Sequence, residues 1–473
     1  MKKVIIIGLL IIAVVTTVYA LFPYQEVTTS SEKAYSYYLS GLESGYKMYY
    51  PEAIEAFRNA VKEDPSFAMA HLLLGKYLRY TGEGQLGRRE IEIADSLKGK
   101  VSEREQLLIG YHYARLNDDS SQADLLLLDL LKMYPQTVEP HEELAREYQA
   151  EAKFDSAISE FRKIIDIEKN YAEAYNELTY FYLNKGDFAE ALTNVEKYSF
   201  ICSNQPNPFD TKGEVLLTSG KYDEAIAAFS HSIELKSDFI FGWMHLAAAY
   251  TEVGRFNDAE QCWSKYLEIG ASDAEQLWGK RQKAGLEVLR GNFKKALKVY
   301  KDAADNEMLK SDPGVYFDLG LTHTGLGDIK AARNQLKHLS EMLKENPGRL
   351  DIEYYYNKLM AEIGLAQGDY TKAREAMMKA IDMISIPHQN VFNYAKLAEI
   401  EMKAGLVDNA SQTVNGGLAF NSNHPRSLSI LTQIYSEKGN TKAVRKTAEK
   451  YLQIMAKADA GHPEVIKIES FLN

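Results

Sequence analysis

Hydrophobic positions in this chain recur with the period of an α-helix. Between residues 207 and 266, apolar side chains stand three, four and seven places apart, for example at Ile226, Phe229 and Ile233. This spacing gathers side chains on one face of a helix. The pattern breaks near Gly220, where a polar segment follows. The chain is therefore expected to form short amphipathic helices joined by tight turns.

The pattern also repeats at a fixed distance of 34 residues. Five small or aromatic positions align between two successive segments: Gly213 with Ala247, Gly220 with Gly254, Tyr222 with Phe256, Ala225 with Ala259, and Phe229 with Trp263. A turn glycine can end one helix in the left-handed conformation, and small residues let two helix axes approach. One such hairpin cannot bury its own apolar face, so it stacks on its neighbours. The repeat predicts an all-α fold, an α-solenoid.

Related patterns cover most of the chain and predict about twelve helical hairpins. The hairpins begin near Ala34, and their spacing loosens after Ile269. We therefore expect an N-terminal array over residues 34–270 and a more divergent C-terminal array over residues 271–458. Residues 459–473 are expected to supply a capping helix.

The recurrence of small, aromatic and proline residues at this period resembles the tetratricopeptide repeat (TPR) family over nearly all of residues 34–458. The resemblance implies a right-handed superhelix whose inner face, lined mainly by the first helix of each hairpin, binds peptides or protein surfaces. Residues 102–250 resemble in particular the repeat arrays attached to bacterial serine/threonine kinases and adenylate cyclases. A hydrophobic N-terminus stands here where those proteins carry their effector domain.

Projection of the first helices of four consecutive hairpins gives the residues expected on the inner face. They are mostly polar, with more acidic than basic groups: Glu142, Arg146, Asn176, Tyr180, Asn184, Asp210, Glu214, Thr218, Met244 and Glu252. The Lys–Asn pattern with which the family holds a C-terminal carboxylate is not present among them. A net acidic groove favours a protein or peptide partner with a basic or amphipathic segment.

Composition narrows the classes of function. The chain has 473 residues, of which 45% are hydrophobic and 26% charged, and a net charge of −11. These values fit an ordered helical protein, and the acidic balance argues against nucleic acid as a partner, because phosphate binding needs excess Lys and Arg. Cys202 and Cys262 lie nearly two repeats apart, so we expect two free thiols on different layers.

No group of residues in the sequence predicts catalysis, a cofactor or a metal. The segment 82–87, Gly-Glu-Gly-Gln-Leu-Gly, matches a dinucleotide-binding pattern by letter. That motif needs a preceding strand and a following helix, whereas this segment is expected to form the turn of the second hairpin. His141 is followed by two glutamates but not by the second histidine of a zinc protease helix, and no Cys-x-x-Cys pair occurs. We expect a non-enzymatic protein.

The N-terminus carries a possible membrane signal. Lys2 and Lys3 precede an uncharged apolar segment, residues 4–22, which is followed by a polar linker at residues 23–33. The apolar segment fits a signal peptide cleaved behind Ala20, and it also fits a retained signal anchor. In both cases the lysines stay in the cytoplasm. The repeats are then expected on the extracytoplasmic side of the cell membrane or, after cleavage, in the periplasm or secreted.

Two functions are compatible with these features. The first is a protein–protein interaction scaffold, anchored to or exported across a membrane, that binds partners on the inner face of its superhelix. The alternative is a regulatory or sensory subunit for a separately encoded kinase, cyclase or transcription factor, which requires the repeats to lie in the cytoplasm.

Overall fold

The structure is a computed structural model that describes residues 27–46, 49–151, 153–270 and 272–473. Throughout these residues the regular structure is helical, with no strand. The predicted all-α hairpin fold is therefore confirmed. The hydrophobic segment 4–22 lies outside the described residues. Within them, no helix combines the length and the apolar character needed to cross a membrane.

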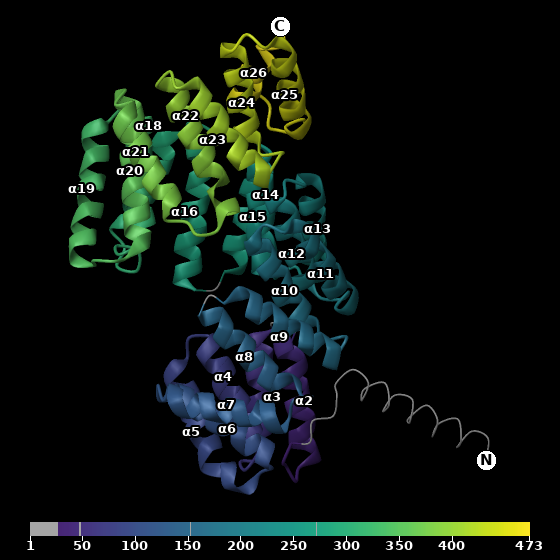
Figure 1. The fold of residues 1–473 in the computed structure, drawn as a ribbon. Coiled ribbons are helices and arrows are strands. Elements are labelled where there is room, and N and C mark those ends of the chain that lie inside the picture. Colours follow the sequence, from purple (N-terminus) through teal and green to yellow (C-terminus); the bar gives the residue numbers. More distant parts are fainter. Residues whose placement is uncertain (1–26, 47–48, 152, 271) are drawn as a thin grey trace. The chain divides into compact units, whose positions relative to one another are not determined.

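The helices pair as twelve successive hairpins, and a short helix follows them (Figure 1). The pairs are α2 (Glu32–Tyr46) with α3 (Tyr50–Glu63), α4 (Ala68–Tyr80) with α5 (Gly84–Leu97), α6 (Glu103–Leu116) with α7 (Ser120–Met133), α8 (Val138–Ala150) with α9 (Phe154–Ile167), α10 (Ala172–Lys185) with α11 (Phe188–Ile201), α12 (Pro206–Thr218) with α13 (Tyr222–Leu235), α14 (Ile240–Glu252) with α15 (Phe256–Ile269), α16 (Asp273–Leu289) with α17 (Phe293–Ala304), α18 (Pro313–Gly325) with α19 (Ile329–Glu345), α20 (Leu350–Gln367) with α21 (Tyr370–Asp382), α22 (Val391–Lys403) with α23 (Val407–Phe420), and α24 (Pro425–Glu437) with α25 (Thr441–Ile454). Helix α26 (Pro463–Glu469) ends the series, and two short 3-10 helices, η1 (Lys98–Lys100) and η2 (Pro387–Asn390), lie between hairpins.

Local sequence signals set the ends of these helices. Ser102 begins α6 with a capping box, in which its hydroxyl accepts from the Glu105 backbone N–H and the Glu105 carboxylate accepts in return; this satisfies N–H groups that have no partner within the helix. At the turns inside the hairpins, Gly220 and Gly254 have φ values of 78° and 70°. That left-handed conformation favours glycine, as the aligned positions predict.

Small residues allow the two helices of a hairpin to pack closely. A Cβ atom added to Gly213 would lie only 2.4 Å from Cε1 of Phe229, and Phe229 is fully buried. One repeat later Ala247 and Ala259 are also fully buried, and Trp263 packs against Trp278 with ring centroids 5.2 Å apart. The small and aromatic positions of the repeat therefore serve the packing of the hairpins.

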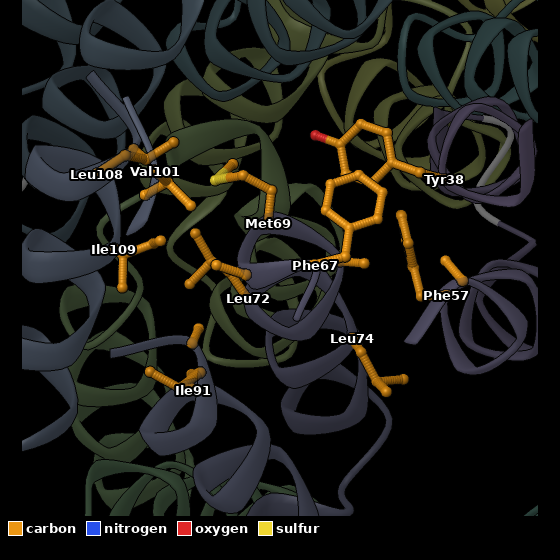
Figure 2. Close-up of a cluster of buried hydrophobic side chains, with 14 of the residues drawn as sticks. Tyr38, Phe57, Phe67, Met69, Leu72, Leu74, Ile91, Val101, Leu108 and Ile109 are labelled. Atoms are coloured by element: carbon orange, nitrogen blue, oxygen red, sulfur yellow. The ribbon is translucent and has the colours of Figure 1, made fainter. Parts of the chain in front are cut away.

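The chain divides into two compact units, which are described separately. The first contains residues up to Phe181 together with 200–203, and the second contains 182–199 and 204–473. The array boundary predicted at residue 270 falls within the second unit and stays a prediction about sequence divergence. In the first unit the core runs through α2 to α7. Figure 2 shows the rings of Tyr38 and Phe67 lying against each other in this core, with centroids 5.0 Å apart.

In the second unit, early hairpins contact late ones. Asn421, just after α23, donates from Nδ2 to the hydroxyl of Tyr222 at 3.1 Å, across 199 residues of sequence. Asn423 donates from Nδ2 to the carbonyl oxygen of Gly220 at 3.0 Å, across 203 residues. The turn between α12 and α13 is thereby bonded to the loop between α23 and α24.

A second contact of the same kind joins the turn between α14 and α15 to the segment before α26. The backbone N–H of Asn257 donates to Oδ2 of Asp459 at 3.0 Å, across 202 residues, and the ring of His462 stacks on Phe256 with centroids 5.3 Å apart. These separations are close to six repeats of 34 residues. The second unit therefore meets itself again after about six hairpins, and we refer to these contacts as the seam.

Candidate functional site

The first helices of successive hairpins share a common register. Helices α4, α6, α8 and α10 begin 35, 35 and 34 residues apart. Lys76, Tyr111, Arg146 and Tyr180 therefore occupy the same position of their helices. A side chain at this position points in the same direction in each hairpin, so the four residues are expected to form one row.

Part of this row lines a hollow of about 350 Å³ in the first unit. Three consecutive first helices, α4, α6 and α8, supply its lining residues: Lys76, Arg79, Tyr80, Tyr111, His112, Arg115, Glu143, Arg146 and Glu147. Every one of these side chains is charged or aromatic. The inner face here can bind polar groups as well as flat apolar ones.

A buried ion pair lies at the base of the hollow. Lys76 donates from Nζ to Oε1 of Glu143 at 2.9 Å, and Nε2 of His112 lies 3.4 Å from the same oxygen. Burial alone would raise the pKa of Glu143, but Lys76 and His112 outweigh it and hold the pKa well below its usual range. Burial lowers the pKa of His112. The arrangement is a charged Lys76–Glu143 pair beside a neutral imidazole.

Two carboxylates share a single guanidinium at the side of α8 that faces α10. Arg146 donates from Nη2 to Glu142 at 2.5 Å and to Glu173 at 2.8 Å. Glu142 is the main cause of the raised pKa of Arg146. Burial and the charge of Glu142 raise the pKa of Glu173 to about 7, although its side chain keeps 34% of its surface exposed. One cation does not fully balance these two carboxylates.

Register decides where the structure places the ten residues expected on the inner face. Arg146 lines the hollow, and Tyr180 and Glu214 occupy the same helix position as Arg146. The position of Tyr80 in α4 is taken by the following three of the ten: Asn184, Thr218 and Glu252. The remaining four share another position of the helix, where Asn176 and Asp210 are buried while Glu142 and Met244 are half-buried. Their assignment to partner binding stays a prediction.

Three of the residues that build the hollow and its border were not expected from the sequence. Glu143 and Glu177 occupy the same position of α8 and α10, and Glu173 lies one turn before Glu177. The helix starts needed to recognise this register are 35 residues apart early in the chain and 34 later. A projection that assumes one constant period therefore misses them.

In the second unit, two of the expected residues meet a histidine. Nδ1 of His245 lies 3.0 Å from both carboxylate oxygens of Asp210, and Nε2 lies 3.6 Å from Glu214. Burial alone would lower the pKa of His245, but the hydrogen bond and the charge of Asp210 raise it. In the described part of the chain, this is the one group whose spacing suits a metal ion. The short His245–Asp210 contacts account for it as a hydrogen-bonded ion pair.

The glycine-rich segment 82–87 has a packing role. Gly82 forms the turn between α4 and α5 with a φ of 90°. A Cβ atom on Gly87 would lie 2.6 Å from the carbonyl oxygen of Gly75 on the facing helix. The glycines thus allow the turn and the close approach of the two helices. Cys202 and Cys262 are both buried and free, as expected.

Comparison with known proteins agrees with the helical repeats. Models described as tetratricopeptide repeat match residues 50–96, 210–239 and 352–385. The chain is 24% identical over 388 residues to Protein CTR9 homolog of Arabidopsis thaliana, covering 70% of this chain and 34% of that protein. It is 23% identical over 245 residues to lipopolysaccharide assembly protein B of Escherichia coli strain K12, covering 49% of this chain and 60% of that protein.

Solved structures are similar only in a general way. A chain in the crystal structure of the APC/C hetero-tetramer Cut9–Hcn1 has a TM-score of 0.35 and 12% identity, covering 94% of this chain and 97% of that chain. The chain spans between about a third and three fifths of the length of the curated relatives it matches. The repeats matched at three places, in a chain of twelve helical hairpins, identify this protein as one built from tetratricopeptide repeats.

Proposed function

We propose that this protein is a non-enzymatic scaffold that binds partner proteins on the inner face of its first helices. The observation that carries the proposal is the hollow in the first unit, which three consecutive first helices line with charged and aromatic side chains alone. Tetratricopeptide repeats generally serve as protein-binding surfaces without catalytic activity, and the repeats here leave these side chains in a row.

Binding would take place on a surface that is already formed. Lys76 and Glu143 hold each other in place at the base of the hollow, and Arg146 is held by two carboxylates. A partner that docks here therefore orders few protein side chains, which reduces the entropic cost of association. Polar side chains would determine specificity, and a basic or amphipathic segment of the partner would match the acidic groups of the inner face.

The proposed location is the outer side of a cell membrane. Residues 4–22 would act as a signal anchor, or as a signal peptide removed behind Ala20. The likeness to lipopolysaccharide assembly protein B supports a place in the bacterial cell envelope. Protease added to intact spheroplasts of the native host should then digest the repeats. Repeats protected inside the cytoplasm would favour the second candidate, a regulatory subunit for a separate kinase, cyclase or transcription factor.

A photo-crosslinking residue tests the binding face in the native host. Arg79 lines the hollow, whereas Arg89 is exposed on the second helix α5. A benzoylphenylalanine in place of Arg79 should give a defined adduct with a partner protein, and the same residue in place of Arg89 should not. Adducts of equal yield and identity from both positions would rule out the inner face as the binding surface.

A further inference from the structure

We propose that one end of the inner face of the first unit is a binding site for a lysine or arginine side chain of the partner, an inference that rests on the proposed scaffold function. Five residues form this site, which we call the cation site: Tyr50, Tyr77, Tyr80, Glu173 and Glu177. Three aromatic rings and two carboxylates are the groups that together recognise an organic cation.

The three tyrosines form a mutually packed group at the junction of α3 and α4. Tyr50 lies 5.8 Å from Tyr77 and 6.5 Å from Tyr80, measured between ring centroids, and Tyr77 and Tyr80 are 6.0 Å apart at right angles. Tyr80 leaves 55% of its surface exposed. The face of an aromatic ring attracts a cation placed within about 6 Å of its centroid, and rings at different angles can surround one.

The group is held rigidly from behind. The ring of Tyr77 stacks on the fully buried Phe57, with centroids 5.6 Å apart and an angle of 19° between the rings. A Cβ atom on Gly45 would lie 2.0 Å from the hydroxyl oxygen of Tyr77, so only a glycine leaves room for this ring. The position of Tyr77 is therefore fixed before a ligand arrives.

The two carboxylates come from α10 and act on the tyrosines. Burial raises the pKa of Tyr50, and the charges of Glu173 and, more weakly, Glu177 raise it further. Burial also raises the pKa of Glu177, and this carboxylate has no hydrogen bond or ion pair among the residues that the structure describes. Glu173 shares Arg146 with Glu142. A further cation would stabilise both carboxylates in their charged form.

The surrounding charges leave an excess of negative charge. Four carboxylates from α8 and α10 lie around two cations: Glu142, Glu143, Glu173 and Glu177 around Lys76 and Arg146. Lys76 is bound to Glu143, and Arg146 to Glu142 and Glu173. A basic side chain of a partner supplies the missing positive charge, and partial burial strengthens its attraction to Glu173 and Glu177.

Binding of defined peptides tests the cation site in the full chain. The probes are three fluorescein-labelled Gly-Ser peptides that carry four arginines, four lysines or four glutamates, followed by fluorescence anisotropy at pH 8. We expect the arginine and lysine peptides to bind and the glutamate peptide not to bind. Glu173→Gln with Glu177→Gln should weaken binding roughly tenfold, and Tyr80→Ala about threefold, whereas Tyr80→Phe should bind as the wild type does.

A matched control removes the same charge from another surface. Asp129 and Asp166 are exposed on the second helices α7 and α9, and Asp129→Asn with Asp166→Asn should leave peptide binding within twofold of the wild type. Equal losses in the two double variants, or an unchanged affinity in Tyr80→Ala, would overturn the cation site. If the peptides fail to bind while the adduct at Arg79 still forms, this inference is wrong and the scaffold function stands; if neither occurs, both fail.

Discussion

The inner faces of the two units use the same helix position for different chemistry. In the first unit that position holds Lys76, Tyr111 and Arg146, which line a hollow with paired charges. In the second unit the same position holds Glu214 and Ala248, and the cluster of charges nearby is the His245 pair with Asp210. The position is constant in the fold, but its side chains are not.

The comparison separates the residues that build the hairpins from those that could recognise partners. Gly213 and Phe229 fit against each other in one repeat, and Ala247 and Trp263 take their places in the next. Those positions alternate among small and aromatic types only, because close packing limits their volume. The inner-face position is free of that restriction, so it can carry the differences in binding.

The units also differ in how far they wind. The seam joins elements about 200 residues apart, or about six hairpins. The first unit holds four complete hairpins, α2 to α9, with most of α10, so it is too short for a seam of its own. Long-range bonds should make the second unit stiffer, whereas the first unit is stabilised by contacts between neighbouring hairpins.

The largest expected effect concerns the shared packing positions. Phe229→Ala removes a fully buried ring that contacts Gly213, and we expect a loss of about 3–5 kcal/mol in the free energy of unfolding of the second unit. Chemical denaturation followed by circular dichroism measures it. Phe241→Ala, at a ring that is 55% exposed, should cost less than about 0.5 kcal/mol. Similar losses at both positions would contradict the assigned roles.

The seam can be tested by two glycines of nearly equal backbone conformation. Gly220 and Gly327 have φ values of 78° and 76°. A Cβ atom on Gly220 would lie 2.1 Å from Oδ1 of Asn421, whereas one on Gly327 would meet nothing within 4 Å. Both substitutions to Ala strain the backbone, by roughly 1 kcal/mol, so the difference between them isolates the seam.

We expect Gly220→Ala to destabilise the protein by about 1–3 kcal/mol more than Gly327→Ala, because Asn421 must move and its bond to Tyr222 is lost. Hydrogen exchange at residues 218–224 should increase only in Gly220→Ala. Equal destabilisation and equal exchange in the two variants would mean that the seam contributes nothing to stability.

The sequence predicted the hairpins well and the inner face only in part. Gly220 and Phe229 could be interpreted because their roles depend on local turns and on a neighbouring helix, which a 34-residue offset reveals. The seam bond of Tyr222 with Asn421 was not predictable, since it depends on how six hairpins accumulate their rotation. Glu173 and Glu177 were missed because small changes in repeat length shift the register of the helix face.

Acidity should weaken the second unit through a buried histidine. Burial lowers the pKa of His424 to about 3, from about 6.5. The unfolded chain binds a proton below about pH 6.5 while the folded chain does not, so the free energy of unfolding falls as the pH decreases from 7 towards 4. We expect His424 to account for about 1–2 kcal/mol of this loss.

The control for this prediction keeps the helix cap. Nδ1 of His424 accepts from the backbone N–H of Ser427 at the start of α24, and asparagine is also a favourable residue at this position. Denaturation at pH 7 and pH 5 should show a smaller loss of stability on acidification in His424→Asn than in the wild type. The same loss in both proteins would show that His424 remains uncharged in the unfolded chain or takes up its proton while folded.

The smallest expected effect asks whether one partner uses both units. Tyr180 and Glu214 occupy the same helix position in consecutive hairpins but belong to different units. Substituting both by Ala should lower the yield of the Arg79 adduct about fivefold, equivalent to about 1 kcal/mol, with the helical content unchanged. If a partner binds along both units, each single substitution should account for part of the loss. If the first unit alone binds it, Tyr180→Ala should account for all of it and Glu214→Ala for none, and the inner face of the second unit would then serve a different partner. An unchanged yield in the double variant would remove both residues from the binding surface.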